Sequence, residues 1–338
     1  MHRYIKAVGA GTRRARALSR DEAREAMSLV ASGRVEPVQV GAFLAALRMK
    51  GETPDELAGF ADAFAAHVPA GVVRDDVLEV DAHGDGHGDA PSILVAAACA
   101  AAASGVPVCL AVERGSSFAR HGLDGALAAI GLDGPLPAAR ARQDLDRAGI
   151  ASTDLSLACP PLARLVALRP LLGLRTAAQT IAKLVSSFSP GCHRRVAGVF
   201  HAPYLESTAA ALGLVGVERG LVVQALGGLP EARPGKIVRV ADAGGAPRTI
   251  DLRAFVSEEG AAAERPSDED DYPGPPTLDG GQPTLSALAG RMPEAKRAAA
   301  AAAILIHAAT GADPLSAAEV ALAALTSGRA RAIADRLR

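Results

Sequence analysis

The sequence predicts an α/β protein with a small all-helical N-terminal domain and a larger α/β domain built on a mainly parallel central sheet. Residues 1 to about 70 carry two strong helix-start signals, β-branched runs then alternate with alanine-rich segments, and helical periodicity returns over Leu162 to Leu184. We place the helical domain at residues 1–72, re-entered by about 160–188. The α/β domain then comprises residues 73–159 and 189–338.

The helical domain is predicted from its capping signals. Ser19 followed by Glu22 forms a capping box, in which the serine oxygen accepts an exposed amide and the glutamate reaches back. A helix over Arg20 to Ser32 follows. Thr53 and Glu56 repeat the signature, with proline at the first helical position, where its missing N–H costs nothing.

The second domain is predicted from short β-branched runs separated by alanine-rich segments. Such alternation indicates a parallel sheet covered by helices. The chain closes with predicted helices over Glu294 to Ala309 and Ser316 to Leu325. The predicted strands are Val77 to Val80, Val106 to Val112, Arg195 to Phe200, Leu221 to Ala225 and Ile237 to Ala241.

Composition excludes several classes of protein. The apolar run from Ile93 to Val112 is studded with small residues and reads as a buried helix followed by a strand, so no membrane partner is expected. The N-terminus is polar and basic, without an apolar signal core, and a cytoplasmic location follows. The cysteines lack metal-ligand spacing and are interpreted as reduced core thiols. They are Cys99, Cys109, Cys159 and Cys192.

Several segments resemble the anthranilate phosphoribosyltransferase family. They are Leu18 to Met27, Gly41 to Leu44, Ala46 to Leu57, Gly198 to His201, Gly220 to Val223, Lys296-Arg297 and Thr326 to Ala330. The resemblance covers nearly the whole chain. It implies a helical domain joined to an α/β domain, a homodimer formed through the helical part, and phosphoribosyl pyrophosphate with Mg²⁺ in the interdomain cleft.

Two further segments resemble the divergent YbiB-like branch of this family. They are the run Gly173 to Leu184 and the basic start Gly9 to Arg16. That branch resembles the enzyme in fold and has been associated with nucleic-acid binding. The choice of branch therefore bears on function.

The resemblance also suggests a donor site. The family's Gly-Thr-Gly-Gly-Asp falls on Ala82 to Gly86, its Asn-Ile-Ser-Thr on Ser92 to Val95, and its Lys-His-Gly-Asn-Arg-Ser on Leu110 to Gly115. Glycines let the backbone approach pyrophosphate oxygens. The residues that remain for phosphoribosyl pyrophosphate, or another phosphorylated small molecule, are Gly84, Asp85, Gly86, Ser92 and Arg114.

The metal and acceptor sites of the family are only half retained. The Asp-Glu pair that helps to hold Mg²⁺ corresponds to Pro230-Glu231, so Glu231 is the metal candidate if the protein is catalytic. Two arginines at the acceptor carboxylate correspond to Arg169-Pro170, which leaves Arg169 alone. Activity on anthranilate is therefore not expected. The alternation of Asp and His over residues 81–89 permits a metal site, but the glycines give no fixed ligand geometry and solvated loop residues are the favoured interpretation.

Two functions remain open. In the first, the chain is a divergent phosphoribosyltransferase with an aromatic or nitrogenous acceptor. In the second, it is a noncatalytic YbiB-like protein whose dimer binds nucleic-acid phosphates through basic surfaces. A net charge of −1 and an aromatic content of 3% weigh against the second. Its candidate residues are Arg13, Arg14, Arg16, Lys183, Arg194 and Arg195.

Overall fold

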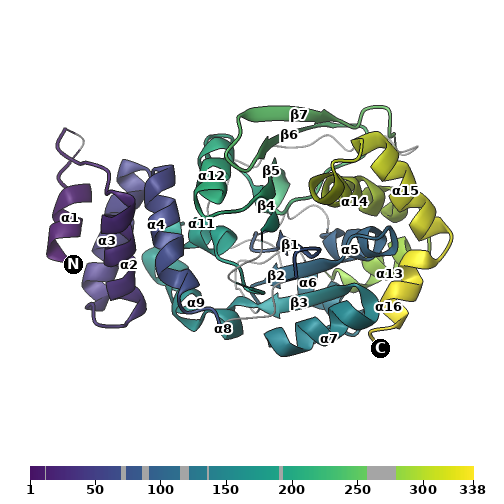
Figure 1. Cartoon of the computed structure of the whole chain (residues 1–338), viewed down its shortest axis with the longest axis horizontal. Helices are drawn as coiled ribbons and strands as arrows, with labels where there is room; N and C mark the ends of the chain where they lie inside the picture. Colours follow the sequence, from purple (N-terminus) through teal and green to yellow (C-terminus); the bar gives the residue numbers. More distant parts are fainter. Residues whose placement is uncertain are drawn as a thin grey trace.

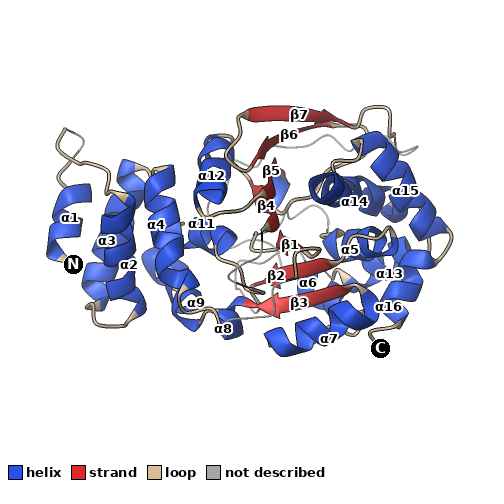
Figure 2. Cartoon of the chain, viewed as in Figure 1, coloured by secondary structure: helices blue, strands red, loops and turns tan. Residues whose placement is uncertain are grey.

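The computed structural model has a helical part at one end and an α/β part at the other (Figures 1 and 2). This arrangement confirms the predicted fold class. The structure describes residues 1–11, 13–69, 74–85, 91–114, 122–134, 137–189, 193–256 and 279–338.

Helices from two separate stretches of the chain build the helical part. Both predicted capping boxes are present, and a third, at Thr176 and Gln179, begins the last of these helices. The residues of both stretches share one hydrophobic core, which includes Phe43, Phe60 and Ile181. The helices are α1 (His2–Val8), α2 (Arg20–Ala31), α3 (Pro37–Lys50), α4 (Pro54–Ala65), α8 (Leu155–Ala158), α9 (Pro160–Val166), α10 (Arg169–Leu172) and α11 (Ala177–Leu184).

The helical periodicity over Leu162 to Leu184 does not form one helix. Gly173 ends α10 in the left-handed conformation, with φ of 67°, which glycine adopts without a Cβ clash. Thr176 then caps α11 in extended conformation. The chain therefore turns between α10 and α11, and both helices contribute side chains to the cavities described below.

The α/β part is built on a seven-stranded sheet in the order β3-β2-β1-β4-β5-β6-β7. The first five strands in this order pair in parallel, and β6 pairs antiparallel with both β5 and β7. The five predicted strands are found within two residues of their predicted starts. The strands are β1 (Leu78–Asp81), β2 (Val108–Val112), β3 (Ile150–Asp154), β4 (Arg194–Val199), β5 (Arg219–Gln224), β6 (Ile237–Asp242) and β7 (Pro247–Asp251).

Two edge strands escaped prediction. β3 has the sequence Ile-Ala-Ser-Thr-Asp, whose small and polar residues resemble a loop although all five are buried. β7 has Pro247 at its first residue and alternates exposed with buried positions. Proline is tolerated there because it begins an edge strand. In both cases pairing with a neighbouring strand decides the conformation.

The two faces of the sheet pack on different partners. One face contacts α5 and the C-terminal helices, in a core formed largely by alanines. The other face contacts α12, whose core continues into the helical part (Figure 1). The helices of the α/β part are α5 (Leu94–Ala103), α6 (Leu123–Ala128), α7 (Ala138–Ala148), α12 (Pro203–Leu214), α13 (Gly281–Leu288), α14 (Glu294–Thr310), α15 (Pro314–Thr326) and α16 (Arg329–Asp335).

The apolar run from Ile93 onward forms α5 and then β2, both buried as predicted. In the part of the chain that the structure describes, no helix has the length and apolar character needed to cross a bilayer. Cys99, Cys109 and Cys159 are buried, in line with their interpretation as core residues. Cys192 lies outside the described residues.

A buried carboxylate on β1, that of Glu79, connects the sheet to the segment that follows α11. Glu79 accepts hydrogen bonds from Arg195 Nη2 at 2.6 Å, Ser186 Oγ at 2.6 Å and the Ser187 amide at 2.8 Å. Its pKa is lowered by Arg195 and these donors although burial alone would raise it. The carboxylate is thus stable in the core only with its partners in place.

Replacing Arg195 by methionine should reduce the free energy of unfolding by about 3 to 5 kcal/mol, because Glu79 would stay buried without its counter-charge. Urea denaturation at neutral pH measures this loss. The double variant Glu79→Gln/Arg195→Met should recover part of it. A single variant as stable as the unaltered protein would show that the ion pair does not anchor the sheet.

Candidate ligand-binding site

Two adjoining cavities lie between the helical part and the carboxyl ends of the parallel strands, where open α/β sheets bind ligands. The first has a volume of about 450 Å³ and the second about 400 Å³. Arg169, Pro170, Arg175 and Gln179 line both. The shared wall comes from α10, α11 and the turn between them.

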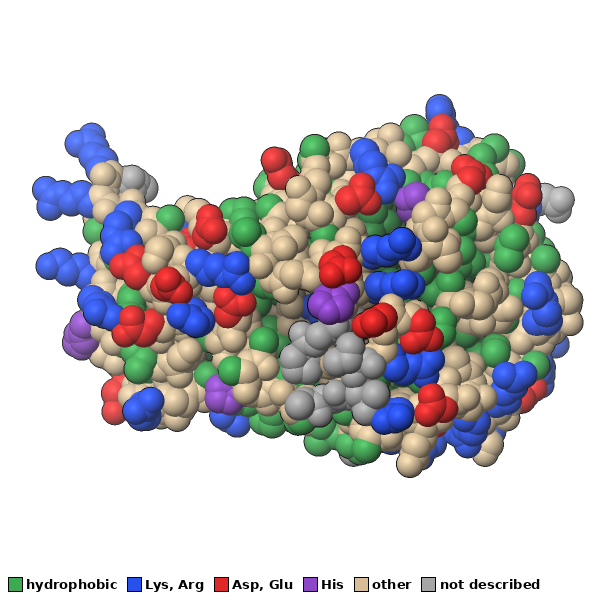
Figure 3. All heavy atoms as spheres, viewed as in Figure 1, with side chains coloured by type: hydrophobic (Ala, Val, Ile, Leu, Met, Phe, Trp, Pro, Cys, Tyr) green, Lys and Arg blue, Asp and Glu red, His purple; other side chains and the backbone are tan. Residues whose placement is uncertain are grey.

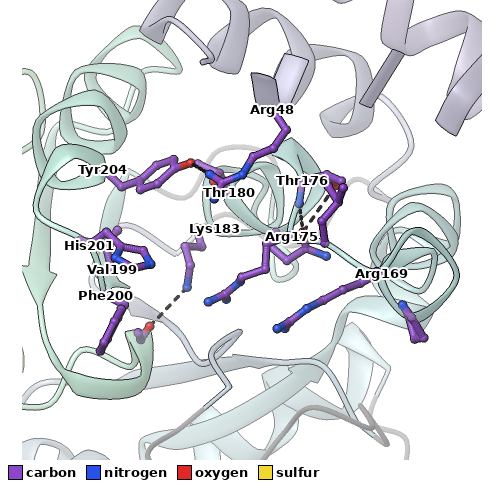
Figure 4. Close-up of a pocket in the computed structure, with 16 residues that line it drawn as sticks. Arg48, Arg169, Arg175, Thr176, Thr180, Lys183, Val199, Phe200, His201 and Tyr204 are labelled. Carbon is purple, nitrogen blue, oxygen red and sulfur yellow. Dashed lines mark hydrogen bonds between the residues drawn. The ribbon is translucent and has the colours of Figure 1, made fainter. Parts of the chain in front are cut away.

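The first cavity is cationic. The described residues that line it include Arg48, Arg169, Arg175 and Lys183 but no Asp or Glu. The charged ends of Arg169, Arg175 and Lys183 point toward the same part of the cavity (Figure 4). Arg48 of α3 donates to the hydroxyl of Tyr204 on α12, which joins the helical part to the α/β part across the cavity. Such a lining suits a polyanion.

Asp85, a predicted donor residue, and Arg169, the predicted acceptor residue, form an ion pair. Arg169 Nη1 lies 2.7 Å from Asp85 Oδ1, and Arg175 Nη1 lies 3.4 Å from Oδ2. The two arginines lower the pKa of Asp85 although burial, the largest effect, opposes them. The carboxylate therefore stays ionised and occupies cationic groups that a ligand phosphate would need.

The packing around Gly84 leaves no room for a side chain. A Cβ there would lie 2.7 Å from the Gly227 carbonyl oxygen and 3.0 Å from a methyl carbon of Leu229. The absence of a side chain lets the loop after β1 pack directly on the loop after β5. Gly86 lies outside the described residues.

Ser92 and Glu231 meet at the start of α5. Ser92 Oγ donates to Glu231, and the amide of Ile93 donates to the same carboxylate at 3.4 Å. Burial raises the pKa of Glu231, while Ser92 and Arg297 lower it to a smaller extent. The N-terminus of a helix favours an anion. A protein carboxylate thus occupies the position expected for a donor phosphate.

The predicted metal ligand is consequently engaged in internal hydrogen bonds. No set of three His, Cys, Asp or Glu side chains among the described residues is arranged to hold a metal ion. Within the alternating Asp and His motif, His87 and Asp89 lie outside those residues. Asp81 and His83 bind each other instead.

Arg114 lines the second cavity, but its guanidinium group binds residues in and after α6. Its Nη2 donates to the carbonyl oxygen of Leu132 at 2.8 Å, and its Nη1 lies 3.5 Å from Asp124. Arg114 therefore braces the segment around α6. It is not brought together with Ser92 and Glu231.

His83 is held in the second cavity by buried charges. Its Nδ1 lies 2.7 Å from Asp81 Oδ1, and Lys183 Nζ lies 2.7 Å from Asp81 Oδ2. Because a carboxylate only accepts hydrogen bonds, Nδ1 carries a proton. Lys183 and His83 hold the pKa of Asp81 well below its usual range, against the larger opposing effect of burial.

Glu113, which follows β2, also lines the second cavity. It forms no hydrogen bond or ion pair with any residue that the structure describes. Burial, the largest effect, raises the pKa of its carboxyl group, while His83 and Arg169 lower it to a smaller extent. A partly buried carboxylate without a partner is a candidate for ligand contact.

The residues predicted for nucleic acid divide into two sets. Lys183 and Arg195 are buried in ion pairs with Asp81 and Glu79, so the expectation that they form a basic surface is wrong. Arg16 pairs with Glu22. Arg13 and Arg14 are exposed in the segment between α1 and α2. Over the helical part, Lys and Arg side chains lie among Asp and Glu side chains (Figure 3). Arg194 is partly buried on β4.

Sequence reasoning missed several residues of the cavities. Arg48 and Tyr204 are far apart in the sequence, and no motif connects them. Arg175 belongs to the Gly173 to Leu184 run, whose sequence indicates a family branch and contains no site motif. The sequence does show that Asp81 and His83 are two residues apart. In the structure they bind each other, whereas the alternating motif suggested that they could share a metal ion.

The sequence matches two family models in succession. The helical bundle domain of a glycosyl transferase family covers residues 2–68, and the a/b domain of that glycosyl transferase family covers residues 76–331. Together they account for nearly the whole chain.

Known proteins with similar sequences and structures agree with this match. Anthranilate phosphoribosyltransferase of Methylocella silvestris is 32% identical over 95% of this chain and 90% of its own length. The Synechococcus enzyme is 35% identical over 64% of this chain and 61% of that protein. The Thermus thermophilus enzyme superposes with a TM-score of 0.79 at 26% identity, covering 99% and 98% of the two chains. The Saccharomyces cerevisiae enzyme, in complex with PRPP and Mg, gives 0.78 at 17% identity, covering 99% and 96%.

Replacing Glu113 by glutamine should increase the free energy of unfolding by about 1 kcal/mol at neutral pH, because an unpaired, partly buried charge is removed. The folded-state pKa of Glu113 is raised, so the folded protein loses stability as pH rises from the ordinary glutamate value through that pKa. The gain should therefore be absent below the ordinary value. Thermal unfolding at neutral and acidic pH measures it, with Asp335→Asn on α16 as the control. An equal gain at both pH values would contradict the interpretation.

Proposed function

The chain belongs to the anthranilate phosphoribosyltransferase family, and from this premise we propose that it is a phosphoribosyltransferase acting on an acceptor other than anthranilate. The observation that carries the proposal is the pair of adjoining cavities, one cationic and one with a free carboxylate, which meet at Arg169 and Arg175. In this arrangement the phosphates of the donor bind in the first cavity. The acceptor binds in the second.

The placement of the donor follows from charge. Arg169, Arg175 and Lys183 face the first cavity, and the first two now bind Asp85. Donor phosphate oxygens would replace the Asp85 carboxylate on these arginines, since guanidinium groups bind phosphate and carboxylate with the same geometry. The donor site is thus displaced from the start of α5, where Glu231 takes the place of a phosphate.

The preference against anthranilate rests on two features. Arg169, which the resemblance assigns to the acceptor carboxylate, is already paired with Asp85 and is followed by Pro170 in place of a second arginine. The Glu113 carboxylate lines the same cavity and would repel a carboxylate-bearing acceptor. Both features are compatible with transfer to an uncharged or cationic acceptor.

The yeast relative was solved with PRPP and Mg. In this chain Glu231 is committed to Ser92 and to the start of α5, and the described residues do not fit a protein-built Mg²⁺ site. Mg²⁺ commonly keeps water ligands and binds through substrate phosphates. Any Mg²⁺ requirement would then lie with the donor and not with a dedicated set of carboxylates.

Titration calorimetry with phosphoribosyl pyrophosphate and Mg²⁺ tests the donor site. Arg175→Gln should weaken binding about tenfold, because a charge-assisted hydrogen bond to phosphate is lost. Asp85→Asn should strengthen binding by about threefold or more, because the competing carboxylate is removed. Arg331→Gln, on the exposed side of α16, is the matched control and should bind as the unaltered protein does.

If the unaltered protein shows no saturable binding of the donor at millimolar concentration, the transferase proposal fails. If Asp85→Asn binds more weakly than the unaltered protein, the donor phosphates do not occupy the position of that carboxylate. Anthranilate should give no product in a coupled assay with the unaltered protein or with Asp85→Asn.

Nucleic-acid binding, as in YbiB-like proteins, is the second candidate function. The observation that favours it is the exposed pair Arg13 and Arg14, which takes part in no ion pair within the described residues. A homodimer formed through the helical part would present two such patches. Exposed apolar side chains on α3 and α10 are available for that contact, namely Val38, Met49 and Leu171.

Fluorescence anisotropy with a labelled single-stranded oligonucleotide tests this candidate. Affinity should fall steeply with salt, and the variant Arg13→Ser/Arg14→Ser should reduce the slope of log K against log[salt] by about 1.4, since two phosphate contacts are lost. Arg331→Gln on α16, away from the helical part, should leave the slope unchanged. Negligible affinity at low salt would eliminate the nucleic-acid candidate.

A further inference from the structure

We infer that the second cavity binds a planar nitrogenous ligand through neighbouring N–H donors, with Glu113 and His83 Nε2 as the two acceptors. The inference rests on the proposed transferase function and names the chemical class of its acceptor. It assigns a ligand contact to two residues that the resemblance left without one. The argument proceeds from the unsatisfied groups in the cavity.

His83 supplies the first acceptor. Its side chain is 3% exposed, and its Nε2 has no hydrogen-bond partner. The backbone amide and Nδ1 of His83 both bind Asp81 Oδ1, so Nε2 lies on the opposite edge of the ring. In the neutral ring Nε2 is a lone-pair acceptor, and a buried acceptor without a partner is costly. The Asp81–Lys183 ion pair keeps the ring in this orientation.

Glu113 supplies the second acceptor. It lines the same cavity as His83 and lacks a partner within the described part of the chain. The other carboxylates of this cavity are committed, since Asp85 binds Arg169 and Asp154 Oδ1 accepts the Ser156 amide at the start of α8. Glu113 and His83 Nε2 thus remain as acceptors in this cavity, and the exposed Arg164 of α9 lines it as a cation.

The free groups define what the ligand must offer. An amidine, or an aminated heterocycle, presents two N–H donors in one plane and would satisfy the Glu113 carboxylate and His83 Nε2 together. A carboxylate-bearing ring of the same size offers only acceptors and meets the charge of Glu113. A site built from hydrogen-bond acceptors discriminates strongly between such ligands, because the wrong one leaves buried groups unpaired.

Benzamidinium and benzoate are the probes, because they share a ring and a planar head group and differ in donors and charge. Titration calorimetry on the full chain without donor should show saturable binding of benzamidinium and none of benzoate. Glu113→Gln should weaken benzamidinium binding at least tenfold, and Asp335→Asn should leave it unchanged. Glu113→Gln also lacks the unpaired charge, so unfolding of this variant is not expected to obscure the result.

The pH dependence gives a second readout. Burial raises the pKa of Glu113, and the groups that act on it are His83, Asp85, Asp154 and Arg169. Because only the ionised carboxylate attracts a cation, benzamidinium affinity should increase as pH rises above the ordinary pKa of glutamate. Glu113→Gln should flatten this profile. A structural role of Glu113 alone would not produce a ligand profile that depends on its charge.

Three results would overturn the inference: benzoate binding as tightly as benzamidinium, no benzamidinium binding at millimolar concentration, or unchanged binding in Glu113→Gln. None of them bears on the donor titration, which is carried out without acceptor. Donor binding without benzamidinium binding would refute the acceptor class and leave the transferase function in place. Benzamidinium binding without donor binding would support the cavity assignment and refute the transferase function.

Discussion

The arrangement of this protein depends on two buried carboxylates of β1, Glu79 and Asp81. They lie two residues apart and so face the same side of the strand. Glu79 is neutralised by Arg195 of the neighbouring strand β4, and Asp81 by Lys183 of α11. Since an uncompensated buried charge is strongly destabilising, the sheet and α11 can pack in only this relative position. The walls of both cavities follow from that position.

The same anchoring holds the first residues after β1, His83 and Gly84, in place. Lys183 Nζ also donates to the carbonyl oxygen of His83 at 2.7 Å, and Gly84 packs against Gly227. The start of the loop is therefore held from two sides before any ligand binds. His83 and Gly84 are thereby preorganised for recognition, and one ring edge of His83 is directed away from Asp81.

Protein carboxylates occupy two positions where a transferase of this family is expected to hold anionic ligand groups. Glu231 lies at the N-terminus of α5, and Asp85 lies between Arg169 and Arg175. Both pairings are favourable without ligand, so a phosphorylated ligand at either position would have to compete with them. The competition differs at the two positions: Asp85 is partly exposed beside a cationic cavity, whereas Glu231 is bound to Ser92 within the fold. This contrast favours ligand binding between the two parts of the molecule over binding at α5.

Local signals in the sequence determined the fold class, the capped helices and the five β-branched strands, because caps and hydrophobic periodicity act over a few residues. The resemblance supplied the family and brought Arg169, Asp85 and Glu231 into consideration. Tertiary structure alone decided what these residues bind: Arg169 meets Asp85 across 84 positions of the chain, and Glu231 meets Ser92 across 139. It also placed β3 and β7, whose sequences lack a strand signal. Buried charges choose partners by distance in space and by the cost of desolvation, and neither quantity can be read from local sequence.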